Sequence, residues 1–211
     1  MHQLPVVKSV AVRDSVVEVI RQALYSRRFE PGQTLSDVSI AAEMEVSRGP
    51  VREALLLLVQ EGLVSHQPNR GFSVVQLTAA DVAEIHRVRV PLEATALVAA
   101  KAEITDGDLA LLRELRNAIA SEFIKGNSPA CTQADIRFHS LIWERAGNSR
   151  LAATLQTLLS PYFAYGSLEK VHGDTVRSGE TIAHEHDLII DYLRGQSEMS
   201  AEDCIRFHLG L

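Results

Sequence analysis

The chain has 211 residues, of which 46% are hydrophobic and 23% are charged, and its formal net charge at pH 7 is −6. No window approaches the roughly 18 consecutive apolar residues that a transmembrane helix requires, and the first residues lack the long apolar core of a secretory signal. Two cysteines are too few for a disulfide framework, so these numbers exclude membrane-spanning and disulfide-rich classes and favour a cytoplasmic protein with one large or two small domains.

The first part of the chain predicts three helices. Apolar residues recur with a 3.6-residue period over residues 10–28, and a Pro-Gly pair just beyond them ends that helix. A short helix follows over residues 37–44, with Ser36 as its N-cap. The third helix begins after a turn at Glu45, and Ser47 can cap it by accepting backbone N–H bonds.

Two short apolar and β-branched runs, 63–67 and 71–75, follow the third helix. The residues between them include Asn and Gly, which tolerate the backbone conformation of a hairpin tip. Three helices followed by a hairpin predict a winged helix-turn-helix domain over residues 1–77.

The remaining residues, 78–211, predict an all-α domain. Thr78 and Thr105 each precede an aspartate by three residues, which is the pattern of a capping box. Nearly every later segment has helical periodicity, interrupted at glycines, and no long strand-like run is present, so we expect an all-α bundle of about six helices. The predicted fold class is therefore mainly α, with a winged helix-turn-helix followed by a helical bundle.

The start of the third helix carries residues that could read DNA. A helix-turn-helix places the first residues of its second helix against base edges in the major groove. Here these residues are Ser47, Arg48 and Gly49, with Arg52 one turn later. Arginine can bind guanine with two hydrogen bonds, and Arg70 at the hairpin tip could contact phosphate or enter a minor groove. The alternative is that these arginines simply face solvent, and the equal numbers of basic and acidic residues in this part permit DNA binding without proving it.

The motif LSDVSIAAEMEVSRGPVREALLLLVQEGLV, followed by NRGFSV, resembles the DNA-binding domain of the GntR family of bacterial regulators. That family combines a Val-Ser-Arg-x-Pro-Val-Arg-Glu-Ala-Leu recognition helix with Asn-Arg-Gly in the wing. The resemblance implies contacts with bases and phosphates from the helix start and the wing. The residues concerned are Arg48, Gly49 and Arg52 in the helix and Asn69, Arg70 and Gly71 in the wing.

The sequence departs from the family pattern at two places. Glu45 occupies a turn where the family usually has Gly, so this corner could differ in shape, and it adds negative charge near DNA. Leu56 and Leu57 stand where members commonly carry polar or basic residues, and at 100° per residue they lie away from the apolar face of the helix. We expect them to pack on the second domain or on a partner chain, although they could instead reduce phosphate affinity.

Histidines and carboxylates are concentrated in the second part of the chain. Asp135 and His139 are four residues apart and therefore share one helix face. Residues 184–187 read His-Glu-His-Asp, and His208 lies near the end of the sequence. Carboxylate and imidazole ligands together suit zinc, nickel, iron or manganese better than calcium. A single histidine on a helix is more often structural than a ligand, so this pattern is weak by itself.

The second part also resembles the FCD domain, the ligand-sensing domain of the FadR-like branch of the GntR family. The resemblance rests on the Asp-x3-His helix, the Gly-Asn after it, a Glu-His pair in a late helix and the final histidine. It implies a divalent transition metal held by four ligands, Asp135, His139, His186 and His208. His184 would then lie beside the site, unless a different helix register put it in place of His186.

Arg89 matches the arginine of the first helix of that domain and is the candidate for binding a small carboxylate effector with two hydrogen bonds. Four protein ligands would leave positions open on a six-coordinate metal, where the same carboxylate could bind. The alternative for Arg89 is an ion pair with Glu93 at i+4 of the same helix. Pro91, between these two residues, should kink the helix or leave a carbonyl free.

Together these patterns predict a ligand-responsive transcriptional regulator, either a repressor or an activator. Two chains would pair through their helical domains, and the homodimer would bind a pseudo-palindromic operator in double-stranded DNA. A second hypothesis is a regulator whose helical part is a plain dimerisation module without metal. A metal-dependent hydrolase is the third, but no general base or phosphate-binding glycine loop accompanies the site, and the N-terminal part would have no role.

Overall fold

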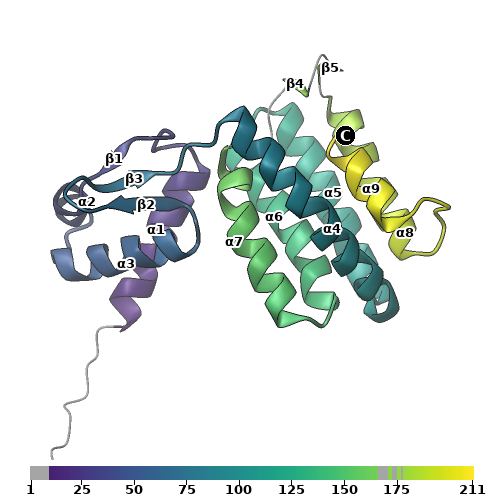
Figure 1. Cartoon of the computed structure of the whole chain (residues 1–211), viewed down its shortest axis with the longest axis horizontal. Helices are drawn as coiled ribbons and strands as arrows, with labels where there is room; N and C mark the ends of the chain where they lie inside the picture. The colour runs from purple at the N-terminus through teal and green to yellow at the C-terminus, as the bar shows by residue number, and fades with distance from the viewer. Residues whose placement is uncertain (1–9, 166–170, 173–174, 177) are drawn as a thin grey trace, which may run out of the picture. The chain divides into compact units, whose positions relative to one another are not determined.

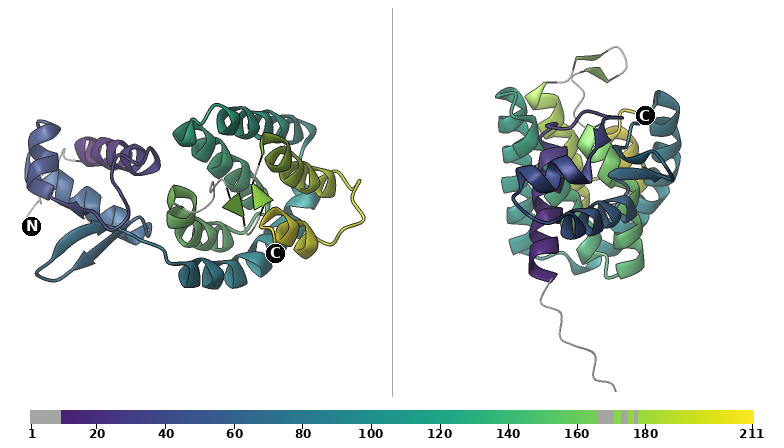
Figure 2. Two further views of the ribbon diagram at one scale, coloured as in Figure 1. Left: turned by 90° about the horizontal axis from the view of Figure 1, so that it is seen from above. Right: turned by 90° about the vertical axis from the view of Figure 1, so that its left-hand side faces the viewer.

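The computed structural model of the chain describes residues 10–165, 171–172, 175–176 and 178–211. The chain forms two compact units, Met1–Gln76 and Leu77–Leu211, which are described separately. Figure 1 labels their helices and strands, and Figure 2 shows the ribbon from two further directions. Within the described ranges, no helix is both long enough and apolar enough to cross a membrane.

The first unit combines three helices with a three-stranded antiparallel sheet. Its elements are α1 Val10–Tyr25, β1 Thr34–Leu35, α2 Asp37–Glu43, α3 Arg48–Gln60, β2 Val64–Gln67 and β3 Gly71–Val74. The strands lie in the order β1-β3-β2. α3 contacts α1, α2 and β2, and it buries Val51, Leu55 and Leu58 completely. These elements form the predicted winged helix-turn-helix.

Three details of this unit differ from the expectation. The first helix ends at Tyr25 because Arg27 takes a left-handed conformation with φ of 54°. Ser47 is the N-cap residue of α3 but makes no side-chain capping bond, so that expectation is wrong. An N-cap side chain normally accepts a hydrogen bond from the backbone N–H of the second or third helical residue. In α3 the third helical residue is Pro50, which has no backbone N–H to donate. The strand β1 pairs with β3 although two residues are too few to leave a periodic pattern.

The second unit is a helical bundle. Its described helices are α4 Ala79–Glu103, α5 Asp106–Ile124, α6 Ser128–Arg145, α7 Ser149–Tyr165, α8 Gly179–Leu193 and α9 Ala201–His208. Both predicted capping boxes are present, at Thr78 and Thr105, and α4 continues as a helix through Pro91. Strands β4 Val171–His172 and β5 Thr175–Val176 pair with each other. Strands of two residues are too short to leave an alternating pattern in the sequence, and they leave the expected helical bundle unchanged.

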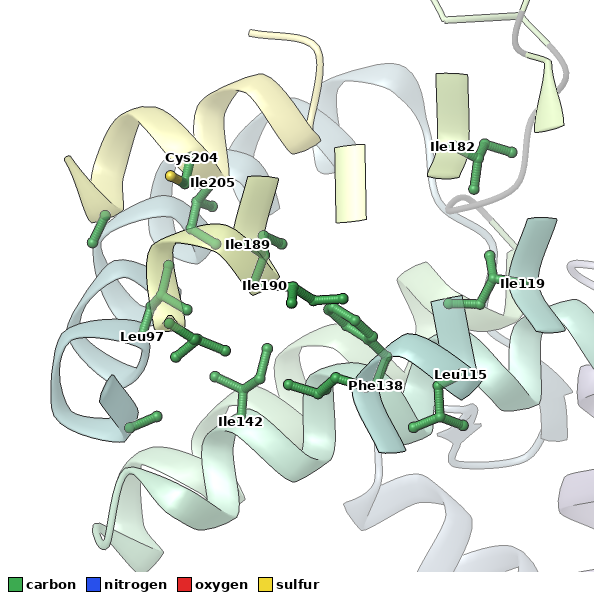
Figure 3. Packing of buried hydrophobic residues seen from close by; sticks show 14 of the residues in the cluster. Leu97, Leu115, Ile119, Phe138, Ile142, Ile182, Ile189, Ile190, Cys204 and Ile205 are labelled. Atoms are coloured by element: carbon green, nitrogen blue, oxygen red, sulfur yellow. The ribbon is translucent and has the colours of Figure 1, made fainter. Parts of the chain in front are cut away.

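An apolar core holds the bundle together. Figure 3 shows part of it, including Phe138 and Ile142 of α6 and Ile189 and Ile190 of α8. A second cluster around Trp143 joins α6 to α4 and α7. α4 contacts α6, α7, α8 and α9, and α8 also contacts α9. This packing brings the inward faces of helices that are distant in sequence to one place, where a group of buried polar side chains lies.

Candidate functional site

The exposed start of α3 carries the residues predicted to contact DNA (Figure 1). Ser47 precedes the helix, Arg48 and Gly49 are its first two residues, and Arg52 follows one turn later. The side chains of Arg48 and Arg52 are 61% and 54% exposed. A Cβ atom added to Gly49 would meet no atom within 4 Å. This turn of α3 is therefore accessible to a ligand outside the unit.

Asp37, the first residue of α2, pairs with both of these arginines. Its Oδ2 lies 3.0 Å from Nη2 of Arg48 and 3.5 Å from Nη1 of Arg52. The hydrogen bond from Arg48 holds the pKa of Asp37 below its ordinary value. In addition, Cζ of Arg52 lies 5.6 Å from the ring centre of Phe72 in β3. Both guanidinium groups are thus held at the helix start although they are exposed.

The three predicted wing residues lie at the tip between β2 and β3. Asn69 and Gly71 take left-handed conformations, with φ of 66° and 80°, which only glycine and asparagine adopt readily. The backbone N–H of Arg70 donates to the carbonyl of Gln67 at 3.1 Å, and the Arg70 side chain is exposed. The tight turn therefore presents Arg70 to the solvent.

The two unusual leucines of α3 differ in exposure. Leu56 is 41% exposed and follows Arg52 by four residues, so the two side chains share one side of the helix. Leu57 is half-buried. Their packing against the second domain or a partner chain stays a prediction.

Three buried histidines from three helices converge in the second unit. The ligand nitrogens of His139 on α6, His186 on α8 and His208 on α9 lie within 4.8 Å of one another. His184, the alternative to His186, is exposed, and its ring packs edge-on against Phe207 at 5.7 Å. The register of α8 therefore places His186, and not His184, in the histidine cluster.

Asp135 adds a buried carboxylate to the cluster. Its Oδ1 lies 3.1 Å from Nε2 of His186 and 3.7 Å from Nε2 of His139. Nδ1 of His186 lies 2.7 Å from the carbonyl oxygen of Ile182 and donates to it, so Nε2 carries the lone pair when the ring is neutral. Burial alone would raise the pKa of Asp135, but the close contact with His186 and the positive groups nearby keep it below its ordinary value.

The described donors fit a divalent transition metal. Nε2 of His139 is buried and has no hydrogen-bond partner among the residues that the structure describes. Ligands at about 2.1 Å from one ion and at right angles are about 3 Å apart. The distance of 3.1 Å from Asp135 to His186 is close to this value, and the distance of 3.7 Å to His139 is somewhat longer. Three imidazoles and a carboxylate suit zinc, nickel, iron or manganese.

Arg89 lies beside this cluster and is almost completely buried, with 1% of its side chain exposed. Its Nε donates to Oε2 of Glu93 at 2.5 Å, so the alternative intrahelical pair is present. The guanidinium carbon lies 5.0 Å from the ring centre of Tyr162 and 5.6 Å from that of Phe163. Nη2 is buried without a hydrogen-bond partner in the described part of the chain. Arg89 therefore keeps N–H groups that could bind a carboxylate.

Glu93 also belongs to the site. The sequence patterns indicate its pair with Arg89 but not its contacts with α6. Its Oε1 accepts hydrogen bonds from Nδ1 of His139 at 3.0 Å and from Nε1 of Trp143 at 3.2 Å. Burial alone would raise the pKa of Glu93, but Arg89 and His139 outweigh it and lower the pKa to about 2. Glu93 is thus an ionised carboxylate in the core of the bundle.

A cavity of about 520 Å³ opens between the start of α4 and α9. None of the clustered histidines lines it. Its wall includes His86, whose ring centre lies 5.3 Å from that of Tyr162, the residue that packs on Arg89. The cavity therefore lies beside the polar cluster, and the His86–Tyr162 contact connects its wall to Arg89.

Comparison with known families identifies both units of the chain. Residues 12–74 match the bacterial regulatory proteins of the gntR family, and residues 84–211 match the FCD domain. The chain belongs to the FCD-containing GntR family of regulators. The predicted family is therefore confirmed, and so is the mainly α fold with its winged helix-turn-helix and FCD bundle.

Individual GntR-family relatives agree with this assignment. The HTH-type transcriptional regulator YdhC of Bacillus subtilis is 26% identical over 190 residues, which cover 90% of this chain and 84% of the relative. An HTH-type transcriptional regulator of the TAR-I ttuE-ttuC' intergenic region of Agrobacterium vitis is 32% identical over 139 residues, 64% of this chain and 81% of the relative. The solved structure of Escherichia coli McbR/YncC has the same fold, with a TM-score of 0.78, 24% identity and coverage of 95% of this chain and 94% of that one.

These relatives are transcriptional regulators and not enzymes. The GntR-family chain is accordingly a DNA-binding transcriptional regulator with an FCD domain. The hydrolase hypothesis has no support from the families or from the relatives.

Proposed function

We propose that this GntR-family regulator binds a pseudo-palindromic operator as a homodimer, and that a small organic acid bound near a metal in the FCD domain controls its operator affinity. In this proposal residues 1–77 contact DNA, whereas residues 78–211 bind the effector and pair the two chains. The regulator could act as a repressor or as an activator. The observation that carries the proposal is the buried cluster of three histidines, from three helices, with Asp135 beside it.

The proposed metal ligands are Asp135, His139, His186 and His208. His139 and His186 are oriented by the protein, because Glu93 and Ile182 accept their Nδ1 protons and leave their Nε2 lone pairs facing Asp135. A bound zinc, nickel, iron or manganese ion would attract the negatively charged carboxylate of an acidic effector.

Arg89 is the proposed partner of the effector's carboxylate. Its Nη2 carries N–H groups without an acceptor in the described protein, and Tyr162 and Phe163 cover the guanidinium carbon. In such a buried position a charge-assisted hydrogen bond is strong and directional. If the acid binds differently to two arrangements of the dimer, coupling to operator affinity of about 1–3 kcal/mol is typical.

The proposed DNA contacts come from two places in the first unit. Arg48 and Arg52 would reach base edges or phosphates, while Ser47 and Gly49 allow the backbone to approach the duplex. The wing would contribute Asn69, Arg70 and Gly71. Support comes from the exposure of both arginines and from the open space at Gly49.

Metal content and ligand response test the FCD half of the proposal. We expect stoichiometric transition metal in the purified wild-type protein and none in His139→Ala, which should still bind operator DNA selected from a random pool. A screen of small carboxylic acids by thermal shift should find an acid that raises Tm, and the rise should disappear with a chelator. Unfolded His139→Ala protein would instead make the metal structural.

A plain dimerisation module is the second candidate for the helical domain. It is favoured by the hydrogen bonds that His139 and His186 already make to Glu93 and Ile182, which are those expected of structural histidines. Wild-type protein that takes up no metal, even when zinc, nickel, iron or manganese is added, would support this candidate and exclude the metal site.

A further inference from the structure

Glu93 is bound by three side chains from two helices. Its Oε2 accepts from Nε of Arg89 on α4, and its Oε1 accepts from His139 and Trp143 on α6. The side chains of Glu93 and His139 are each 2% exposed. A carboxylate in this position acts on a candidate metal ligand and on the candidate effector arginine at the same time.

The contact with His139 selects the tautomer of that ring. A carboxylate at 3.0 Å from Nδ1 requires a proton on this nitrogen. In the neutral ring Nε2 then carries the lone pair, on the side of Asp135 and the other histidines. Partners of this kind fix the orientation of a ligating histidine and increase its basicity.

The contact with Arg89 fixes the orientation of the guanidinium plane. Because Nε donates to Glu93, the plane of the group is defined by a short bond within α4. Tyr162 and Phe163 lie within 6 Å of the guanidinium carbon and limit its movement. Nη2, which has no acceptor in the described chain, is therefore presented in a fixed direction.

We propose that Glu93 is a positioning residue shared by the two halves of the FCD site, which holds His139 in the ligand tautomer and Arg89 in the orientation that receives an acid. This inference rests on the proposed function, because it assumes that His139 ligates a metal. It extends that function by connecting metal affinity and acid affinity through one carboxylate. Glu93 itself is not a ligand in this proposal.

Full-length Glu93→Gln protein provides the test, with Zn²⁺ and Co²⁺ as the probes. The glutamine amide can turn its NH2 group toward Nδ1 of His139, which favours the tautomer with the proton on Nε2. We expect the metal affinity, measured by competition with a chelator, to fall by about 10–100-fold. The visible absorption spectrum of bound Co²⁺ should also change, because a ligand is lost or reoriented.

Trp143→Phe is the matched control. It removes a neutral donor to the same Oε1 atom but leaves the carboxylate and its contacts with Arg89 and His139. Its metal affinity should stay within about threefold of the wild-type value, well short of the loss typical of an altered ligand partner. An equal loss in both variants would show that packing, and not the carboxylate, supports the site.

The outcomes separate this inference from the proposed function. Wild-type protein without metal binding overturns the metal site itself. If the wild-type protein binds metal and Glu93→Gln binds it equally well with an unchanged Co²⁺ spectrum, the role of Glu93 is wrong and the metal site stands. Should Glu93→Gln not fold, Glu93→Asp keeps the charge but shortens the side chain, and wild-type metal affinity in that variant would overturn the inference.

Discussion

This regulator contains two arginine–carboxylate groups in opposite environments. In the winged helix, Asp37 pairs with Arg48 and Arg52, whose side chains are 61% and 54% exposed. In the FCD bundle, Glu93 pairs with Arg89, and the two side chains are 2% and 1% exposed. The same chemistry therefore lies at an open surface in the first group and in a closed core in the second.

This difference in exposure determines whether a substitution that alters binding also alters the free energy of unfolding. An exposed ion pair contributes about 0–1 kcal/mol to folding, so the arginines on α3 can be altered while the unit stays folded. Breaking a buried pair leaves a charge without compensation and destabilises a protein by about 3–5 kcal/mol. Substitutions that remove the charge of Arg89 or Glu93 should therefore affect folding and ligand binding together.

The largest expected effect comes from breaking the buried pair. Arg89→Met removes the cation beside Glu93 and should lower the free energy of unfolding by about 3–5 kcal/mol. Urea denaturation in the presence of a chelator measures this change without a contribution from bound metal. The same substitution at the surface, Arg52→Met, should lower the free energy of unfolding by less than about 1 kcal/mol.

A double variant distinguishes charge from packing in this result. Arg89→Met combined with Glu93→Leu removes both charges and should recover part of the loss, because no isolated charge is left in the core. Equal destabilisation by Arg89→Met and Arg52→Met would contradict the contrast between the two groups.

The second prediction concerns function at the exposed group. Arg52→Ala should weaken operator binding by roughly 1–3 kcal/mol if Arg52 contacts a base. Equilibrium titration of labelled operator DNA at one fixed salt concentration measures this loss. Arg113→Ala, an exposed arginine on α5 of the other unit, is the matched control and should bind like the wild type. Unchanged binding by Arg52→Ala would remove this residue from the DNA contact.

The organisation of the exposed group could be predicted from the sequence because it is local. Arg48 and Arg52 are one helical turn apart. Ser47 and Pro50 mark where that helix begins, and the spacing of Val51, Leu55 and Leu58 indicates which side is buried. The pairing with Asp37 is harder to predict from the sequence, because it joins α2 to α3 across a turn whose shape depends on the left-handed residue Glu45.

The buried group is only partly visible in the sequence. The spacing of Asp135 and His139 places them on one helix face, but their meeting with His186 and His208 depends on how α6, α8 and α9 pack. The i+4 spacing also indicates the pair of Arg89 with Glu93. No spacing indicates the bond from Glu93 to His139, because it joins two different helices whose rotation is set by the apolar core.

Glu45 allows a third and smaller test, in the turn that positions the exposed arginines. It takes a left-handed conformation with φ of 53°, which is unfavourable for a residue with a Cβ atom. Glu45→Gly should raise the free energy of unfolding by about 1 kcal/mol, measured by urea denaturation. Glu53→Gly, in the middle of α3, should lower it by about 1 kcal/mol. A loss of stability in Glu45→Gly would mean that the glutamate side chain stabilises the turn.

The smallest expected effect is the pH dependence of the exposed group. Hydrogen bonding to Arg48, supported by Arg52, keeps the pKa of Asp37 below its ordinary value of 3.8. The pair therefore stabilises the folded state above about pH 4, and this contribution disappears as the pH falls through the lowered pKa. Asp37→Asn should have a slightly lower Tm than the wild type at pH 7, and the difference should shrink as the pH falls below 3.8. Thermal unfolding between these pH values measures it, with Asp14→Asn, an exposed residue paired with its neighbour Arg13, as the control. A difference that persists unchanged at pH 3 would show that Asp37 acts through its packing at the start of α2, and not through its charge on the two arginines.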